Sequence, residues 1–174
     1  MRAIFTVGHS TRAVEEFVEL LRANGVEQLL DIRTVPRSRR NPQFNREALP
    51  EPLARAEIGY LHMPELGGLR HPRPDSRNGA WRNDSFRGYA DYMQTPEFAA
   101  AVEKLIELGS GKQAAIMCAE AVPWRCHRSL VGDALMARSV VVEDIIGGGR
   151  RQPHKITPFA VVEGTRVWYP GVAD

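Results

Sequence analysis

The sequence has few cysteines, little lysine and no long hydrophobic run. No apolar stretch approaches the roughly 20 residues of a membrane-spanning helix. The opening MRAIFTVGHS has too short an apolar segment, and no cleavage-like region, for a signal peptide. We therefore expect a cytoplasmic protein with no membrane partner. In that reducing compartment the only two cysteines, Cys118 and Cys126, are not expected to form a structural disulfide.

The sequence also lacks a large excess of charge. The net charge of +2 is too small to argue for a nucleic-acid or membrane partner through the overall field. Arginine nevertheless supplies 20 of the 23 basic residues, and its planar guanidinium favours carboxylate and phosphate ligands. A pocket for an anion and the codon bias of a GC-rich genome both explain this preference. Many of the arginines fall in predicted loops: Arg33, Arg37, Arg39, Arg40, Arg70, Arg73, Arg77, Arg82 and Arg87.

The composition is that of an ordinary globular domain. Hydrophobic residues make up 43% of the chain and charged residues 25%, so the low hydrophobicity and high charge of disordered chains are absent. A chain of 174 residues has enough core to fold as one domain, spanning 1–174, without covalent cross-links.

Short apolar runs alternate with helical patterns along the chain. Residues 3–7 read as a buried strand, residues 13–25 repeat apolar side chains at helical spacing, and residues 26–33 read as a second strand. The same reasoning predicts helices over 52–58, 86–109 (one or two, with a break near Thr95) and 126–139, strands over 58–63, 112–118 and 140–146, and a tail with β character over 154–170.

Residues 64–85 are rich in glycine, proline and arginine and are longer than most connections in compact domains. They predict a functional loop or lid, or else a disordered insertion. Strands that alternate with helices indicate the α/β class. We expect a single domain with a mostly parallel sheet, helices on both of its faces, this long loop and a short β-like C-terminal tail.

Polar residues collect where the predicted strands end. Ligands of open parallel sheets bind in the crevice outside the carboxyl ends of the strands. We therefore expect these side chains to converge on one side of the domain and to form a site there. The residues at these ends are His9, Ser10, Asp31, Arg33, His62, Glu65, Cys118 and Glu120.

Cys118 is the candidate nucleophile. It follows an apolar strand and faces the predicted start of a helix at Arg128, where amide donors and positive charge would lower the pKa of the thiol. A buried cysteine at a strand end is the alternative. Cys126 is a candidate resolving or supporting thiol. It could also join Cys118, His127, His9 or Glu120 around zinc, but the spacing is not that of a Cys-x-x-Cys knuckle, so we expect no metal.

Other residues of this edge have candidate roles in catalysis or substrate binding. His9 or Glu120 would move protons, and Arg33 and Arg128 would hold an anion. The remaining candidates for substrate binding are Ser10, Asp31, Glu65, Gly67, Gly68, Cys126 and His127. Each has a structural alternative: Asp31 and Arg33 as an ion pair with another segment, the glycines as a tight turn, and His127 as a residue that packs or caps at a helix start. Trp81, Phe86 and Tyr89 are either a stacking wall for a ring or part of the core.

Five stretches, TVGHSTR, DIRTVPRSRRNPQFN, YLHMPELGGLR, FRGYADYM and MCAEAVPWRCHRSLVGDAL, together resemble the bacterial and archaeal domain-of-unknown-function family 488. The resemblance runs over nearly the whole chain. It implies a cytoplasmic α/β domain with a Cys-x-Glu and a Cys-His-Arg motif, and it leaves the activity open. The matching residues are Gly8, His9, Ser10, Asp31, Arg33, Pro36, Ser38, Phe44, Asn45, Leu66, Gly67, Gly68, Cys118, Glu120, Cys126, His127 and Arg128.

A fainter similarity connects the chain with rhodanese-like domains. The stretches LLDIR, AIMC, RSLVGDALMA and DIIGGG follow the order of those domains. The loop from Cys118 to Arg128 departs from their pattern, because it is longer and contains a proline and a tryptophan. This departure puts both a preformed ring of amides and a sulfurtransferase activity in doubt.

These observations favour a domain that binds a small anionic or polar ligand at the strand carboxyl ends, with a cysteine-dependent activity. A nucleotide- or nucleic-acid-binding module without catalysis is an alternative, with loop arginines on phosphates and aromatic rings for stacking. A metal-binding domain is a second alternative. The sequence indicates no particular cofactor or oligomeric state.

Overall fold

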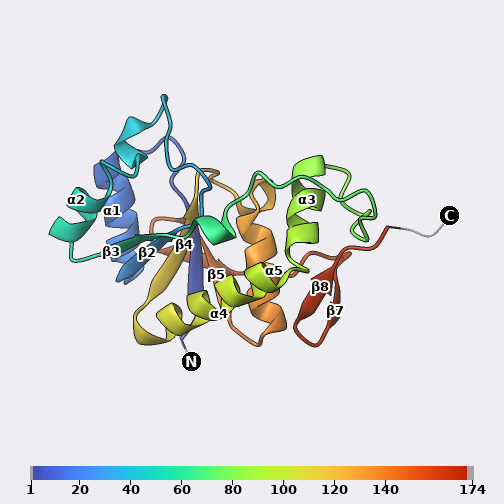
Figure 1. Cartoon of the computed structure of the whole chain (residues 1–174). Helices are drawn as coiled ribbons and strands as arrows, with labels where there is room; N and C mark the ends of the chain where they lie inside the picture. The colour runs from blue at the N-terminus through green and yellow to red at the C-terminus, as the bar shows by residue number, and fades with distance from the viewer. Residues whose placement is uncertain (1, 172–174) are drawn as a thin grey trace.

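Six strands form one sheet, in the order β3-β2-β4-β1-β5-β6 (Figure 1). The structure, a computed structural model, describes residues 2–171. All neighbouring strands are parallel except β6, which is antiparallel to β5. The strands are β1 (Ile4–Gly8), β2 (Gln28–Asp31), β3 (Gly59–His62), β4 (Ala114–Cys118), β5 (Val142–Gly147) and β6 (Arg150–Pro153).

Helices cover both faces of the sheet. Successive side chains of a strand point to opposite faces, so an apolar strand has side chains to bury on both. Leu29 packs with the helices of one face and Leu30 with those of the other. One face carries α1 (Val14–Ala23) and α2 (Pro50–Arg55), and the other carries α3 (Asp84–Tyr92), α4 (Pro96–Gly111) and α5 (Arg128–Ala137). The predicted α/β class, with a mostly parallel sheet between two layers of helices, is confirmed.

The C-terminal segment forms a separate small hairpin of β7 (Val161–Glu163) and β8 (Arg166–Trp168). Gly164, at φ +62°, occupies the turn between these strands, in a left-handed backbone conformation that favours glycine. Val167 and Tyr169 are buried with the helices of the α3–α5 face. The predicted β character of the tail is therefore confirmed, although its strands do not join the main sheet.

The long segment over 64–85 is fastened to the domain by one carboxylate. Asp91, in α3, accepts hydrogen bonds from the Arg73 amide, the Ser76 hydroxyl and the Asn78 side chain. Asn78 is fully buried. The segment contains the short 3-10 helix η2 (Pro64–Leu66) and is otherwise irregular until α3 begins. These buried polar contacts belong to a packed loop, so a disordered insertion is the wrong interpretation.

Two predicted helices begin or end elsewhere. Helix α2 begins at Pro50 and ends at Arg55, whereas the prediction was 52–58. It ends early because Glu57 adopts a left-handed backbone conformation, with φ 61°, which interrupts a right-handed helix. Helix α5 begins at Arg128, since the 3-10 turn η3 (Pro123–Arg125) takes up the residues immediately before it.

The register of the parallel strands brings their carboxyl ends together. Gly8 at the end of β1 is opposite Cys118 at the end of β4, and Asp31 at the end of β2 is opposite both Met117 and His62.

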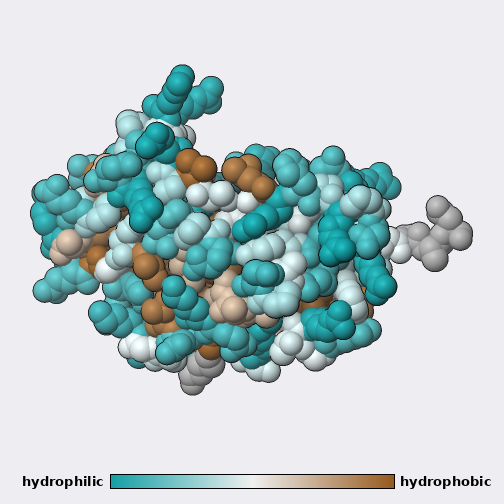
Figure 2. All heavy atoms as spheres, viewed as in Figure 1, coloured by the Kyte–Doolittle hydropathy of each residue, from teal (hydrophilic) through white to brown (hydrophobic). Residues whose placement is uncertain are grey.

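Most of the surface in view is hydrophilic, with a few brown atoms at the upper edge of the molecule (Figure 2). Within residues 2–171, no helix is long and apolar enough to cross a membrane.

Candidate functional site

A cavity of about 710 Å³ opens at the carboxyl ends of β1 and β4. Its walls come from the segments that follow β1, β2 and β4, from the loop after η2 and from the start of α3. Four of the predicted site residues, Asp31, Glu65, Gly67 and Arg128, do not line it. Eight predicted site residues do: His9, Ser10, Arg33, Gly68, Cys118, Glu120, Cys126 and His127.

The guanidinium of Arg128 lies directly against the sulfur of Cys118. Arg128 is completely buried, and its Nη1 donates to Cys118 Sγ over 3.0 Å and also to the Glu120 carbonyl. Nη2 donates to the Ala121 carbonyl over 3.2 Å. The partners of this buried cation are thus neutral carbonyls and a thiol. A thiolate at Cys118 is the one negative charge that these contacts would supply.

The two cysteines have opposite tendencies to ionise. Burial raises the pKa of Cys118, but a hydrogen bond with Cys126 and the charge and hydrogen bond of Arg128 outweigh it and lower the pKa to about 7. Burial raises the pKa of Cys126 well above its ordinary value, and the neighbouring Cys118 raises it further. Cys118 is therefore the thiol of the pair that ionises first, and Cys126 keeps its proton.

The loop after β4 presents carbonyls to this site, and this corrects the expectation of amide donors around the thiolate. Within residues 2–171, no backbone N–H donates to Cys118 Sγ, and the amides of Ser129, Leu130 and Val131 donate to the carbonyls of Cys126 and His127. The loop lies so close to β1 that a Cβ on Gly8 would be 1.6 Å from the Glu120 carbonyl oxygen and 2.7 Å from Arg128 Nη1.

His9 is held as a neutral ring at the edge of the cavity. Its Nδ1 is 2.7 Å from the Ser10 carbonyl, its ring stacks on Phe44 at 4.3 Å, and Arg33 Nη1 approaches Nε2 at 3.4 Å. Burial lowers the pKa of His9 to about 4 against the opposing effect of the Ser10 carbonyl, and Arg33 lowers it further. His9 is therefore a weak base at neutral pH. The Glu120 side chain is exposed and lines the same cavity.

Asp31 and Arg33 form a buried ion pair with each other. Arg33 donates Nε and Nη2 to the two carboxylate oxygens of Asp31, at 2.9 and 2.7 Å, and Nη2 also donates to the Phe44 carbonyl. Tyr60 donates to the same carboxylate at 2.5 Å. These contacts direct Arg33 Nε and Nη2 and both terminal nitrogens of Arg128 to groups of the protein, and the role of the two arginines in holding an anion stays a prediction.

Glu65 and the glycine pair face other parts of the protein. The Glu65 carboxylate is 3.9 Å from Lys104 Nζ in α4, outside the cavity. A Cβ on Gly67 would be 2.4 Å from Thr34 Oγ1, and one on Gly68 would be 3.2 Å from the His127 ring. The glycines thus permit a close approach between protein segments, which corrects the expected approach of a ligand at Gly67.

His127 links the cavity to the sheet. Its Nε2 is 3.0 Å from the Ile32 carbonyl, which fixes the proton on that nitrogen and leaves Nδ1 as an acceptor 3.5 Å from Cys126 Sγ. Burial lowers the pKa of His127 to about 4, despite the opposing effect of the Ile32 carbonyl, and the ring is therefore neutral.

Several lining residues were missed by the sequence reasoning or were left undecided. Arg125 is exposed and lines the cavity, and no ion pair holds it within residues 2–171. Its place beside Cys126 in the sequence was the available signal. Asn83 caps α3 by accepting from the amides of Ser85 and Phe86, and these three residues line the opposite wall. Trp81 lines a different cavity.

A second buried polar cluster also escaped the sequence reasoning. His154, from the segment after β6, lies between Asp133 of α5 and Asp144 of β5, at 3.0 and 3.2 Å. Tyr169 and Thr157 donate to Asp133 as well. These residues are far apart in the sequence, so no short sequence motif contains them together. The cluster fastens the C-terminal segment to α5.

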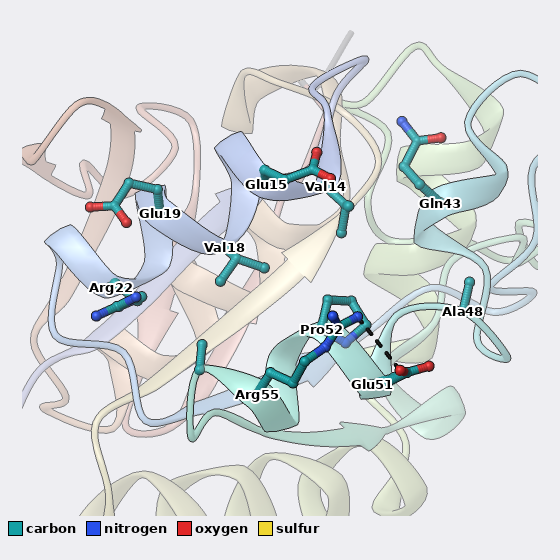
Figure 3. A pocket seen from close by; sticks show the side chains of 11 residues that line it. Val14, Glu15, Val18, Glu19, Arg22, Gln43, Ala48, Glu51, Pro52 and Arg55 are labelled. Carbon is teal, nitrogen blue, oxygen red and sulfur yellow. Dashed lines mark ion pairs between the residues drawn. The ribbon is translucent and has the colours of Figure 1, made fainter.

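The groove between α1 and α2 differs in its lining from the cavity at Cys118. The groove between α1 and α2 has a volume of about 510 Å³ and is lined by side chains such as Val18, Arg22 and Pro52 (Figure 3). It contains neither cysteine nor histidine. Among residues 2–171, no three His, Cys, Asp or Glu side chains are arranged as a group that could hold a metal ion.

The fold and the site define a class: an α/β domain with an arginine-contacted thiol at the carboxyl ends of its parallel strands. The family described as "Domain of unknown function DUF488" matches residues 13–135. The chain belongs to this family. No curated protein and no solved structure matches it.

Proposed function

We propose that the protein is an enzyme that uses the Cys118 thiolate as a nucleophile on a small polar or anionic substrate. The observation that carries the proposal is the contact between Cys118 Sγ and a fully buried guanidinium whose other acceptors are uncharged. A buried charge without a counter-charge is costly. Ionisation of Cys118 supplies that counter-charge and creates a nucleophile at the same time.

The cavity suits a small substrate. Its volume of about 710 Å³ lies within the usual range of small-molecule sites. Arg125 is exposed, lines this cavity and belongs to no ion pair within residues 2–171, so it would attract an anionic group. The Glu120 carboxylate would accept or donate the proton of the reacting group. The nucleic-acid-binding alternative is less well supported, because Arg33 and Arg128 are both used within the protein.

The test is alkylation of Cys118 by iodoacetamide as a function of pH, with the labelled residue mapped by mass spectrometry. The rate should rise with a midpoint near pH 7, following the thiol pKa of about 7. Sulfate should slow labelling in the wild type and in Arg22→Ala, a change in the distant α1–α2 groove, but not in Arg125→Ala. An unreactive Cys118 in the folded protein would return this residue to a purely structural role.

A further inference from the structure

Cys118 and Cys126 are two thiols that share one cavity. Both are free thiols, and both line the same cavity. Arg128 holds the loop between them through the carbonyls of Glu120 and Ala121, and the turn η3 brings the chain back to the sheet. Cys118 Sγ, 3.0 Å from Arg128 Nη1, and Cys126 Sγ, 3.5 Å from His127 Nδ1, therefore belong to the lining of one cavity.

The two sulfurs differ in their polar neighbours: a guanidinium contacts one and a neutral imidazole contacts the other. Cys118 contacts the Arg128 guanidinium at 3.0 Å, which favours its thiolate. Cys126 is next to the neutral acceptor Nδ1 of His127 at 3.5 Å and remains protonated. Cys118 is only 1% exposed, so reagents reach it through the cavity. A small, uncharged oxidant fits this access better than a large one.

We propose that Cys118 is a site of oxidation by hydroperoxides and that Cys126 converts the oxidised product into an internal Cys118–Cys126 disulfide. The inference rests on the proposed thiolate at Cys118. It adds a second step, disulfide formation through Cys126, that the Cys118 nucleophile alone could not supply.

The reaction takes place in two steps. The Cys118 thiolate attacks one oxygen of hydrogen peroxide, the O–O bond breaks, and hydroxide leaves, so that Cys118 becomes a sulfenic acid. The Cys126 sulfur then attacks Cys118 Sγ, the S–O bond breaks, and the departing hydroxide takes the Cys126 proton and leaves as water. The first hydroxide is neutralised by the proton that Cys118 released on ionising. Two thiols are thereby oxidised to one disulfide, and one peroxide is reduced to two waters.

Disulfide formation would stop any reaction that depends on Cys118 as a nucleophile. The two sulfurs would be joined at about 2.0 Å, the length of a disulfide bond. A dithiol reductant would restore the thiolate by exchange. The peroxide chemistry is therefore both an activity of the pocket and a reversible block of the proposed nucleophile.

The test treats the reduced full-length protein with hydrogen peroxide at neutral pH, blocks free thiols with N-ethylmaleimide and digests with trypsin. Trypsin cleaves after Lys112, Arg125 and Arg128, which separates Cys118 from Cys126. The expected product is a peptide of residues 113–125 joined by a disulfide to residues 126–128, and dithiothreitol should split it. Joined peptides found only in covalent dimers, or separate peptides that both carry the maleimide, would overturn the inference.

Variants identify the two roles. Cys126→Ser should form no internal disulfide and should accumulate a Cys118 sulfenic acid that dimedone traps, whereas Cys118→Ser should give neither product. With Arg128→Lys, a thiol pKa returned toward 9 would make oxidation at pH 7 roughly 50-fold slower. Iodoacetamide labelling of the wild type without peroxide reports on the proposed function separately. Rapid labelling without a disulfide would overturn this inference alone, and absence of labelling would overturn the proposed function.

Discussion

Arg128 Nη1 donates to Cys118 Sγ over 3.0 Å, and no carboxylate within residues 2–171 forms an ion pair with this guanidinium. Most buried arginines are paired with an acidic side chain. Here the acidic partner is a thiol that becomes a charged partner only when it ionises. The contact therefore connects the stability of the domain to the reactivity of its cysteine.

The first prediction concerns the thiol pKa. Arg128→Lys keeps the positive charge but cannot supply the planar fork that reaches the sulfur and both loop carbonyls together. We expect the pKa of Cys118, about 7 in the wild type, to be at least roughly one unit higher in Arg128→Lys, as measured by a titration of thiolate ultraviolet absorbance in the two proteins. An unchanged pKa would mean that Arg128 does not stabilise the thiolate.

The second prediction concerns the contact between β1 and the loop after β4. Gly8→Ala should destabilise the fold by about 2 kcal/mol or more, because the new Cβ would be 1.6 Å from the Glu120 carbonyl oxygen, so a backbone segment must shift. Gly111→Ala is the matched control, since a Cβ there meets nothing within 4 Å. Urea unfolding of both variants measures the difference. Equal free energies of unfolding would contradict the close approach.

The third prediction compares a buried ion pair with an exposed one. Asp31→Asn leaves the buried guanidinium of Arg33 without its charged partner and should cost about 3 kcal/mol or more in the free energy of unfolding. Glu51→Gln breaks the exposed pair with Arg55, drawn as a dashed line in Figure 3, whose atoms are 3.6 Å apart. That change should cost less than about 0.5 kcal/mol. Similar losses in the two variants would argue against the assigned burial of Asp31.

The fourth prediction concerns pH and the C-terminal segment. Burial disfavours the charged form of His154, but hydrogen bonds with Asp133 and Asp144 outweigh this effect and raise its pKa to about 9. Because the folded-state pKa lies above the ordinary value of 6.5, the stabilisation is fully present below about pH 6.5 and is lost as the pH rises through about 9. The loss should be on the order of 3 kcal/mol.

Chemical denaturation across this pH range measures the effect of His154. The His154→Gln variant should be less stable than the wild type at low pH, and the difference between the two should shrink as the pH rises. A difference that stays constant across the range would show that His154 does not carry a charge in the folded protein.

The fold follows from local patterns that the sequence displays openly. The apolar runs at Ile4–Gly8 and Ala114–Cys118, and the helical spacing in Val14–Ala23, were sufficient to predict the strands and helices of a parallel sheet. The carboxyl ends of such strands share one edge, and so the presence of His9, Arg33, Cys118 and Glu120 around one cavity could also be expected.

What each of those side chains contacts was decided only by the tertiary structure. The sequence fits either an anion site or an internal ion pair at Asp31 and Arg33, because both require the same residue types. The loop after β4 points its carbonyls toward Arg128. The sequence does not reveal this orientation, because nearly every residue carries both a donor and an acceptor on its backbone. Sequence by itself thus determined which chemical groups reach this edge of the sheet. Packing decided which of these groups hydrogen-bond to other parts of the protein and which do not. Only the folded chain brings distant donors and acceptors within hydrogen-bonding distance.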